Sequence, residues 1–344
     1  MRSAVLRQGA LVVADDIAEP EPGFGQVLVQ VKACGICGSD LHFAKHGARM
    51  LELGGQMRGM PDMGRTPPTL ERDLYMGHEF SAEVLEVGPE TVGPAPGTLV
   101  TSLPVMLTMT GISDLAYTNE FPAGYSERML LSAPLLQVIP NGLDAGSAAL
   151  TEPMAVGLHA VNKSGIAAGS GALVLGCGPV GLAVIAALKL RNVEPIVASD
   201  FSPARRGLAS TMGAHIVVDP AAEDAFDVWT RDGRGSLVVF EAIGVPGIID
   251  GALRDAPPQA RIVVVGVCMQ PDTITPFFGI GKELSLQFVL GYDPMEFAQS
   301  LTSIAEGDID VEPMITGQVD LDGVPGAFDA LANPEKHCKI LVRP

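Results

Sequence analysis

From Ala172 onward, short apolar runs alternate with segments of helical character, and this alternation constrains the fold more than any other feature of the chain. Runs that are apolar at every position indicate strands buried on both faces, and the helices between them supply the crossovers of a parallel sheet. The runs cover residues 172–175, 195–199, 215–218, 236–240, 261–265 and 284–290. We therefore predict a doubly wound α/β sheet, followed by a helix over 294–304.

A glycine-rich turn lies between the first of these runs and a helix expected over 180–189. Gly176, Gly178, Pro179, Val180 and Gly181 form the sequence GCGPVG, which matches the dinucleotide pattern G-x-G-x-x-G in its required context. Such glycines let the backbone approach a pyrophosphate at the helix N-terminus. Similar turns also occur simply to pack a helix close to a sheet, so a second element is needed.

Asp200 supplies that second element, because it follows the next strand about twenty residues further on. A carboxylate there accepts hydrogen bonds from the adenosine ribose and repels a 2′-phosphate, which favours NAD over NADP. Arg205 and Arg206 suit a 2′-phosphate instead, and Asp200 has the alternative role of a helix cap, although Ser202 already fills that role. We predict a Rossmann cofactor domain that binds NAD, with Arg205 and Val267 as further contacts.

The first 150 residues have a different sequence pattern. Short β-like runs such as 26–32 and 81–87 are separated by Gly and Pro clusters, as in an antiparallel barrel. Residues 339–342 read as a last strand that returns to this part of the chain. Because 344 residues exceed what one hydrophobic core usually organises, we expect two domains. Their predicted bounds are 1–150 with 293–344, and 151–292.

Charge and cysteine content narrow the classes of partner and compartment. A formal net charge of −18 opposes binding to nucleic acid and to anionic membranes. No apolar run approaches the roughly 18 residues of a membrane span, and residues 1–10 lack the core of a signal peptide. The 5 cysteines are an odd, scattered set that argues against a disulfide framework. We expect a soluble, cytoplasmic protein.

Three short motifs offer metal ligands ahead of the cofactor unit: 37–42, 77–79 and 151–153. Each has an ordinary explanation by itself, since a lone Cys is usually a packing residue and a Glu before Pro is often first-turn charge on a helix. Cys34 and Cys37 also form a C-x-x-C. No second such pair completes a four-thiolate site, and the motif does not lie at a thioredoxin-like strand-to-helix turn, which disfavours a redox pair.

Taken in this order, the motifs resemble those of the zinc-dependent medium-chain dehydrogenases, specifically the sorbitol, butanediol and threonine dehydrogenase branch. The resemblance rests on residues 31–40, 77–79, 151–159, 176–181, 239–244 and 337–341. It implies a GroES-like β-barrel catalytic domain with a Rossmann domain, and reversible NAD-linked oxidation of a secondary alcohol, diol or polyol. It also implies a homodimer or homotetramer, because the apolar run 284–290 would leave an unpaired sheet edge.

The same resemblance implies that Cys37 and His78 bind one catalytic Zn²⁺. Glu79 and Glu152 complete or exchange within its shell, and we leave open which of them is the resting third ligand. Asp40 is implied to hold His78 in its correct tautomer.

Ser39 and His42 occupy the family's positions for a proton relay. Such a path is required, because zinc makes the alcohol acidic, hydride leaves for the nicotinamide, and the proton must escape a dry site. Two alternatives are a zinc-free quinone or enoyl reductase on the same scaffold and a non-catalytic nucleotide-binding relative. The ligand set counts against the first alternative, and the relay counts against the second.

The chain departs from the family pattern in two places. Many relatives carry a structural zinc on four closely spaced cysteines, which would fall within 100–125, where this chain has none; we therefore expect no structural zinc. The interval from Cys37 to His78 is 78 − 37 = 41 residues, longer than is usual, with the surplus in 48–73. That Met-rich segment is either a tolerated surface insertion or a flexible cover over the substrate cleft.

Overall fold

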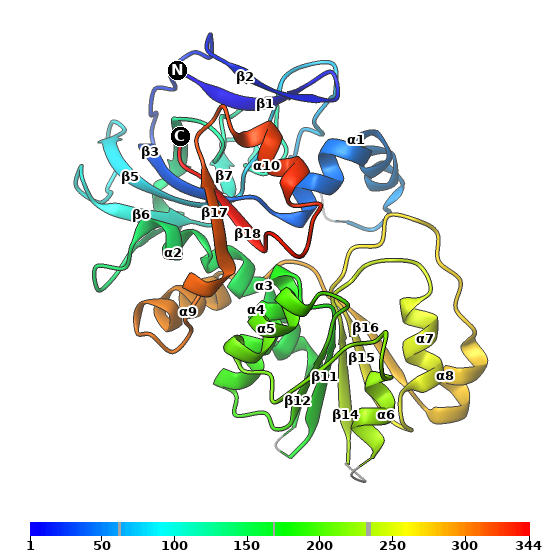
Figure 1. The fold of residues 1–344 in the computed structure, drawn as a ribbon. Coiled ribbons are helices and arrows are strands. Elements are labelled where there is room, and N and C mark those ends of the chain that lie inside the picture. The colour runs from blue at the N-terminus through cyan, green and yellow to red at the C-terminus, as the bar shows by residue number, and fades with distance from the viewer. Residues whose placement is uncertain (61–62, 168, 232–234) are drawn as a thin grey trace. The chain divides into compact units, whose positions relative to one another are not determined.

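The computed structural model describes residues 1–60, 63–167, 169–231 and 235–344. Its internal contacts divide the chain into two compact units (Figure 1). Unit 1 comprises Met1–Glu152, Ile315–Ala332 and Lys339–Pro344, and unit 2 comprises Pro153–Met314 and Asn333–Cys338. No helix in the described ranges is both long and apolar enough to cross a membrane.

Unit 2 is built on a parallel sheet with the strand order β13-β12-β11-β14-β15-β16, which confirms the doubly wound prediction. Its strands are β11 (Gly171–Leu175), β12 (Ile196–Ser199), β13 (Ile216–Val218), β14 (Leu237–Glu241), β15 (Arg261–Val264) and β16 (Ser285–Phe288). Its helices are α3 (Thr151–Ser164), α4 (Pro179–Leu190), α5 (Pro203–Met212), α6 (Ala225–Thr230), α7 (Ile248–Asp255), α8 (Pro276–Lys282), α9 (Pro294–Ala305) and the 3₁₀ turn η2 (Glu312–Met314). Helices flank the sheet on both sides (Figure 1). The strand order reverses between β11 and β14, where ligands bind in sheets of this kind.

Helix α9 groups with unit 2, whereas the predicted bounds had placed it with the first domain. The physical reason is a buried carboxylate on that helix. Glu296 lies 2.7 Å from Nδ1 of His159 and accepts a hydrogen bond of 2.6 Å from Asn162, and both partners belong to α3. These contacts attach α9 to a helix of unit 2.

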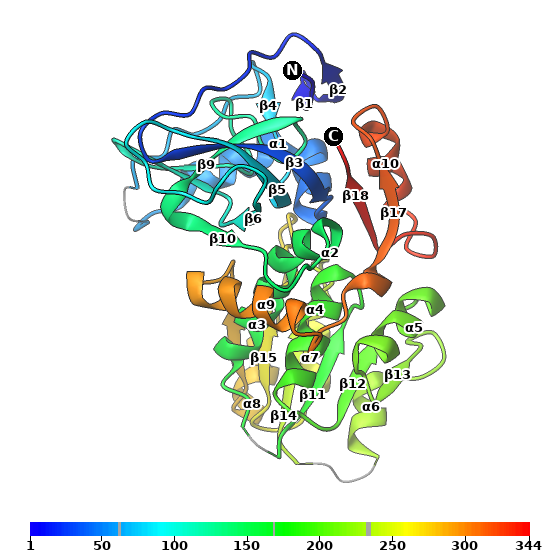
Figure 2. The ribbon, with the colours of Figure 1, turned by 90° about the vertical axis from the view of Figure 1, so that its left-hand side faces the viewer.

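Unit 1 contains a larger, mainly antiparallel sheet with the order β10-β6-β5-β3-β18-β17, and β9 also pairs with β3. Its strands are β3 (Gln26–Gly35), β5 (Glu79–Val87), β6 (Leu99–Ser102), β9 (Arg128–Ser132), β10 (Leu136–Val138), β17 (Ile315–Val319) and β18 (Lys339–Val342). Figure 2 shows β17 and β18 side by side. Because β18 also pairs with β3, the predicted return of the chain to the first domain is correct.

Smaller elements complete unit 1. They are the sheet strands β1 (Ser3–Arg7), β2 (Ala10–Ala14) and β4 (Leu74–Tyr75), the hairpin β7 (Val105–Thr108) and β8 (Gly111–Asp114), the helices α1 (Gly38–Gln56), α2 (Ala145–Ala149) and α10 (Val324–Ala330), and the 3₁₀ turn η1 (Ala133–Leu135). The core of the unit comes from inward-facing positions of the larger sheet, such as Val27, Val29 and Val31 of β3. Alternation along β3 therefore decides which side chains are buried.

The described part of the long 48–73 segment is not a free loop. Its first third continues α1 to Gln56. Further on, the carbonyl of Met63 accepts a hydrogen bond of 3.0 Å from the amide of Ile112 in β8. Gly64 has a φ of 66°, and a Cβ there would lie 2.2 Å from the carbonyl oxygen of Thr110. This position therefore requires glycine, and the segment packs on the β7–β8 hairpin.

The end of the same segment is tied to residues 117–119. The side chain of Asn119 accepts a hydrogen bond of 2.7 Å from the amide of Thr69 and donates to the carbonyls of Thr69 and Asp73, at 3.0 and 2.9 Å. Backbone bonds between Tyr75 and Thr118 continue the contact. One amide side chain thus joins two stretches that lie about 50 residues apart in sequence.

Candidate active site

The pairing of β3 with β5 assembles a potential metal site. Cys37 lies just before the first residue of α1, two residues after β3 ends, and the register pairs Gly35 with Glu79. One ligand atom each from Cys37, His78 and Glu79 lies within 4.8 Å of the others. Sulfur, imidazole and carboxylate are the ligand types of a zinc site, and three protein ligands leave one position open. The donor set therefore fits a catalytic zinc ion.

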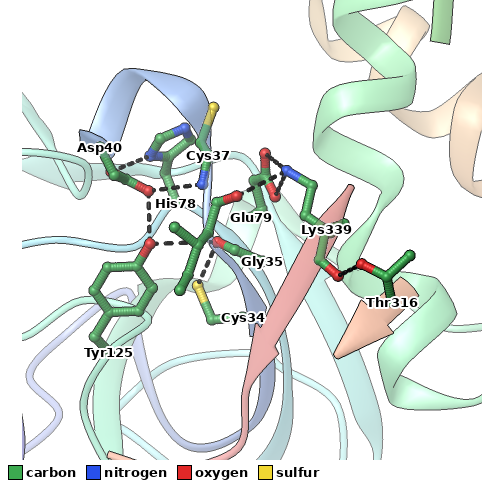
Figure 3. A network of polar contacts seen from close by, with 10 residues as sticks. Cys34, Gly35, Cys37, Asp40, His78, Glu79, Tyr125, Thr316 and Lys339 are labelled. Atoms are coloured by element: carbon green, nitrogen blue, oxygen red, sulfur yellow. Dashed lines mark hydrogen bonds and ion pairs between the residues drawn. The ribbon is translucent and has the colours of Figure 1, made fainter. Parts of the chain in front are cut away.

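Asp40 lies beside His78 and contacts both His78 and the backbone of Cys37 (Figure 3). Its buried Oδ2 accepts hydrogen bonds from the hydroxyl of Tyr125 at 2.6 Å and from the amide of Cys37 at 3.0 Å. Its Oδ1 lies 3.4 Å from Nδ1 of His78. Because Nδ1 faces Asp40, Nε2 is the imidazole atom left for a metal.

The protonation of this pair follows from the opposed effects of burial and charge. Burial raises the pKa of Asp40, but the imidazole of His78, the hydroxyl of Tyr125 and the amide of Cys37 outweigh it and hold the pKa below its usual range. Burial lowers the pKa of His78, but the Asp40 carboxylate outweighs it and raises the pKa well above its usual range. A metal requires neutral imidazole, so metal uptake at His78 releases a proton.

Glu79 has a second partner in the structure. Nζ of Lys339 donates to both carboxylate oxygens at 2.7 Å and to the carbonyl of Ile36 at 3.1 Å, with Glu79 and Lys339 both fully buried. Gly35 makes room for this pair, because a Cβ there would lie 2.0 Å from Oε2 of Glu79. A metal at this site therefore shares Glu79 with Lys339 or displaces the lysine.

The remaining predicted site residues of unit 1 lie at different depths. Glu152 is half-buried in the first turn of α3 and, across the described residues, does not join the three-ligand group. Ser39 is half-buried in the first turn of α1, whereas His42, one turn later, is exposed. His42 lines a pocket of about 710 Å³ together with Lys45 and His46. Partial burial and the charges of those two neighbours lower the pKa of His42.

The C-x-x-C motif crosses from the end of β3 to the start of α1. Cys34 is the next-to-last residue of β3 and Cys37 precedes α1, so the motif does span a strand-to-helix turn. The β3–β5 pairing, which the sequence did not reveal, determines where the strand ends. Burial, followed by the charges of Asp40 and Glu79, raises the pKa of Cys34 well above its usual range. A thiol held protonated is a poor nucleophile, so the redox interpretation stays disfavoured.

The aromatic ring of Tyr117 packs beside the metal ligand His78. Its ring stacks on Phe43 of α1, with centroids 4.3 Å apart and planes 6° apart. It also meets His78 edge-on, with centroids 6.1 Å apart. Burial raises the pKa of the Tyr117 phenol, and the charges of Asp40 and Cys37 add to the effect. The hydroxyl therefore stays protonated at neutral pH.

In unit 2 the glycine-rich turn has the backbone geometry that the motif predicts. Gly176 follows β11 with a φ of 91°, and α4 begins at Pro179. A Cβ on Gly181 would lie 1.9 Å from the carbonyl oxygen of Gly176, so only glycine lets the helix start so close to the turn. The start of a helix after such a turn is the kind of backbone surface that binds phosphate.

Asp200 lies beside this turn, directly after β12. Its Oδ2 accepts a hydrogen bond of 2.8 Å from the amide of Cys177, and Nη1 of Arg205 lies 4.0 Å away. Arg206 is engaged elsewhere: it donates to the carbonyl of Asp200 at 2.8 Å and pairs with Asp219 at 3.1 Å. Of the two arginines, only Arg205 therefore borders the Asp200 carboxylate with its side-chain charge.

Val267 is half-exposed after β15, next to the turn that follows β14. A Cβ on Gly244 would lie 2.7 Å from the amide of Val267, so the two turns pack through a glycine. Glu241 supports the same region, because its carboxylate accepts hydrogen bonds of 2.7 Å from the amides of Ile243 and Gly244.

Sequence reasoning missed three residues of the metal centre: Tyr117, Tyr125 and Lys339. Lys339 did carry a signal, since it stands within the otherwise apolar Cys338–Val342, where a charged residue requires a buried partner. The two tyrosines carried none, because nothing in the segment 115–125 indicates which residues face the centre.

Comparisons with known proteins agree with this architecture. Residues 23–141 match the family described as an alcohol dehydrogenase GroES-like domain, and residues 179–306 match the zinc-binding dehydrogenase family. The chain is 34% identical to (R,R)-butanediol dehydrogenase of Bacillus subtilis (strain 168), over 96% of each chain. It is 26% identical to sorbitol dehydrogenase of the same strain, over 100% of this chain and 97% of that one. The crystal structure of 2R,3R-butanediol dehydrogenase from Bacillus subtilis superposes with a TM-score of 0.83 at 32% identity, covering 100% of this chain and 99% of that chain.

Proposed function

The chain belongs to the zinc-binding dehydrogenases with a GroES-like alcohol dehydrogenase domain, and from this premise we propose that it reversibly oxidises a secondary alcohol, diol or polyol with NAD. The observation that carries the proposal is the group of Cys37, His78 and Glu79, whose ligand atoms lie within 4.8 Å of one another. A zinc-free reductase or a non-catalytic relative has no use for such a buried ligand set.

Within this proposal, Cys37 and His78 hold the zinc, and Glu79 or Glu152 is the third ligand. When bound, zinc supplies a Lewis acid that makes the substrate hydroxyl acidic. Asp40 orients His78 through Nδ1, and Tyr125 and the amide of Cys37 keep Asp40 in position.

Ser39 and His42 carry the released proton outward. They lie three residues apart on α1, and such residues occupy one face of a helix. Ser39 is half-buried and His42 is exposed, so the path leads from the interior to solvent. The lowered pKa of His42 keeps its imidazole neutral at neutral pH, as a proton acceptor must be.

We propose NAD as the cofactor, with Gly176, Gly178, Pro179, Val180 and Gly181 around its pyrophosphate. Asp200 accepts the ribose hydroxyls, and Arg205 and Val267 line the same site. The engagement of Arg206 with Asp219 supports NAD, because it leaves a single arginine near the Asp200 carboxylate.

We also propose a single zinc per chain and a symmetric oligomer. Residues 100–125 contain no cysteine for a structural zinc. Among the described residues, the outer edge of β16 has no neighbour in the sheet, and Phe288, Leu290 and Ile280 are 62%, 87% and 78% exposed at and near it. An apolar edge of this kind invites pairing with a second copy. A monomer by light scattering at micromolar concentration contradicts the oligomer.

One set of experiments tests the function itself. Purified protein is analysed for bound metal and then supplied with NAD and a panel of secondary alcohols, diols and polyols, with NADH formation followed at 340 nm. We expect about one zinc per chain and turnover of at least one class. Two zincs per chain contradict the single site, and protein that holds zinc but oxidises no alcohol contradicts the function.

A further inference from the structure

A pocket of unit 1, lined by α1, α10 and the hairpin of β1 and β2, has no role in the proposed reaction apart from its contact with His42. Its volume of about 710 Å³ falls within the range of about 300–1,000 Å³ that is typical of small-molecule sites. Leu6, Leu11 and Phe328 supply apolar lining, and two of them, Leu6 and Phe328, are buried members of the core. The pocket therefore has an apolar floor that is fixed by the core.

Three basic side chains of α1, those of His42, Lys45 and His46, line the same pocket at exposed positions. They are spaced as neighbours on one helix face, although the backbone of His46 departs from helical geometry (φ −130°, ψ 20°). Partial burial and the charges of His46 and Lys45 lower the pKa of His42, so the three groups are close enough to repel one another. An anion bound among them relieves that repulsion.

The protein does not neutralise this basic group itself. In the described part of the chain, none of the three side chains forms an ion pair with a carboxylate, although the chain has 40 acidic residues against 22 Lys and Arg. Arg49, on the same helix, does pair with Glu52 at 2.7 Å. Asp329 of α10 adds one acidic group to the pocket lining. The local charge is therefore positive in a chain whose net charge is −18.

We propose that this pocket binds a small organic anion, a carboxylate or a phosphate monoester, whose charged group meets Lys45 and His46 and whose apolar body packs on Leu6 and Phe328. Apolar walls with a few convergent charged groups are typical of sites for small molecules. The negative net charge of the chain repels a polyanion such as nucleic acid, which favours a small ligand.

The bound anion also bears on the proposed reaction, because His42 is the outer group of the proton relay. A nearby negative charge favours protonated imidazole, so an occupied pocket leaves less neutral His42 to accept a proton. The other charged groups of the pocket are Lys45 and His46 on α1 and Asp329 on α10. The anion should therefore slow alcohol oxidation in acid and have little effect at higher pH. This consequence rests on the proposed function, whereas the binding itself does not.

The binding test follows the six histidines of the zinc-loaded protein by NMR, with carbon-13 at Cε1 of each ring. His42→Gln and His46→Gln assign the two signals of the pocket. Benzoate and phenyl phosphate should shift both signals and bind more tightly than inorganic phosphate, whereas benzamide, the neutral counterpart of benzoate, should not shift them. An equal response to benzamide, or shifts confined to His78 at the metal centre, overturn the proposal.

Three variants test the charges by the dissociation constant of benzoate. Lys45→Gln should raise it about fivefold, as expected for a partly exposed charge pair, and Asp329→Asn should lower it about twofold because a like charge is removed. Lys32→Gln is the matched control, since Lys32 lies in β3 and pairs with Glu83, and it should leave the constant unchanged. Equal losses in Lys45→Gln and Lys32→Gln indicate a general effect of net charge and overturn the proposal.

Saturating NADH separates this pocket from the cofactor site. The shifts caused by benzoate should persist with NADH bound, and their loss assigns the pocket to the cofactor and overturns the proposal. Benzoate should also raise the pH midpoint of alcohol oxidation, and do so less in Lys45→Gln. Bound benzoate with an unchanged midpoint contradicts the relay role of His42 in the proposed function. Normal turnover without any shift of the two histidine signals overturns this inference alone.

Discussion

The metal centre of unit 1 and the dinucleotide turn of unit 2 are built in opposite ways. The turn uses six consecutive residues and Asp200, and the groups that we propose for cofactor binding there are mainly backbone amides at the start of α4. The metal centre uses side chains from four distant stretches, and its carboxylates Asp40 and Glu79 are fully buried. Charges in a low-dielectric interior interact strongly and are costly when unpaired. Single substitutions should therefore do more damage at the metal centre than at the turn.

The largest expected effect is a loss of turnover without a loss of NADH binding. Cys37→Ala or His78→Ala should lower turnover by roughly 10³-fold or more, equivalent to about 4 kcal/mol, because the Lewis acid is lost. NADH binding, measured by fluorescence titration, should stay nearly intact, because it belongs to unit 2. Loss of NADH binding in both variants contradicts the division of labour.

The next effect is on the free energy of unfolding, and it concerns the buried ion pair of Lys339 and Glu79. Lys339→Met leaves the Glu79 carboxylate buried without its partner and should cost about 3–5 kcal/mol of unfolding free energy in metal-free protein. Lys32→Met is the matched control, since Lys32 pairs with Glu83 at 3.0 Å with both side chains about one-third exposed. That exposed pair should contribute less than about 1 kcal/mol. Urea unfolding measures both variants, and equal losses contradict the importance of burial.

Adding saturating zinc to Lys339→Met and to the unmodified protein tests whether Glu79 is a metal ligand. Glu79 without Lys339 is free to bind the metal, so zinc should restore more stability to Lys339→Met than to the unmodified protein. The increase in unfolding free energy, measured at rising zinc concentrations, gives this difference directly. An identical increment in both proteins indicates that Glu79 is not a ligand and favours Glu152.

A smaller effect is expected at the dinucleotide turn. NAD should be preferred over NADP by at least about tenfold in kcat/KM, or about 1.4 kcal/mol, if Asp200 has its proposed role of accepting the ribose hydroxyls and repelling a 2′-phosphate. Asp200→Ser should shrink or reverse the preference, since Arg205 then faces a neutral pocket. Equal or better use of NADP by the unmodified enzyme contradicts the role of Asp200.

The smallest effect is a shift in pH dependence at His42. Only neutral imidazole accepts a proton, so alcohol oxidation should fall as pH drops through the pKa of His42, with a midpoint below the ordinary value of 6.5. His46→Gln removes one of the charges that lower this pKa, so the midpoint should move to higher pH. A midpoint that does not respond to His46→Gln assigns the acid limb to another group.

The Rossmann sheet and its turn could be predicted because they are encoded locally. Apolar runs at regular spacing, glycines at positions 176, 178 and 181, and an acidic residue after the next strand each follow from backbone requirements of neighbouring residues. The observed strand ends differ from the predicted ends by a few residues, because packing against neighbouring strands decides where pairing stops.

The sequence by itself therefore determined the strand pattern of unit 2, the dinucleotide motif and, through a family resemblance, the residue types of the metal site. The tertiary structure decided what surrounds them. Only the β3–β5 and β3–β18 pairings bring Glu79 to Lys339, 260 residues away, and only the folding of residues 117–125 brings two tyrosines to Asp40 and His78. Contacts between side chains that are distant in sequence leave no local periodicity to read. The partners of a buried charge are consequently known only once the chain has folded around it.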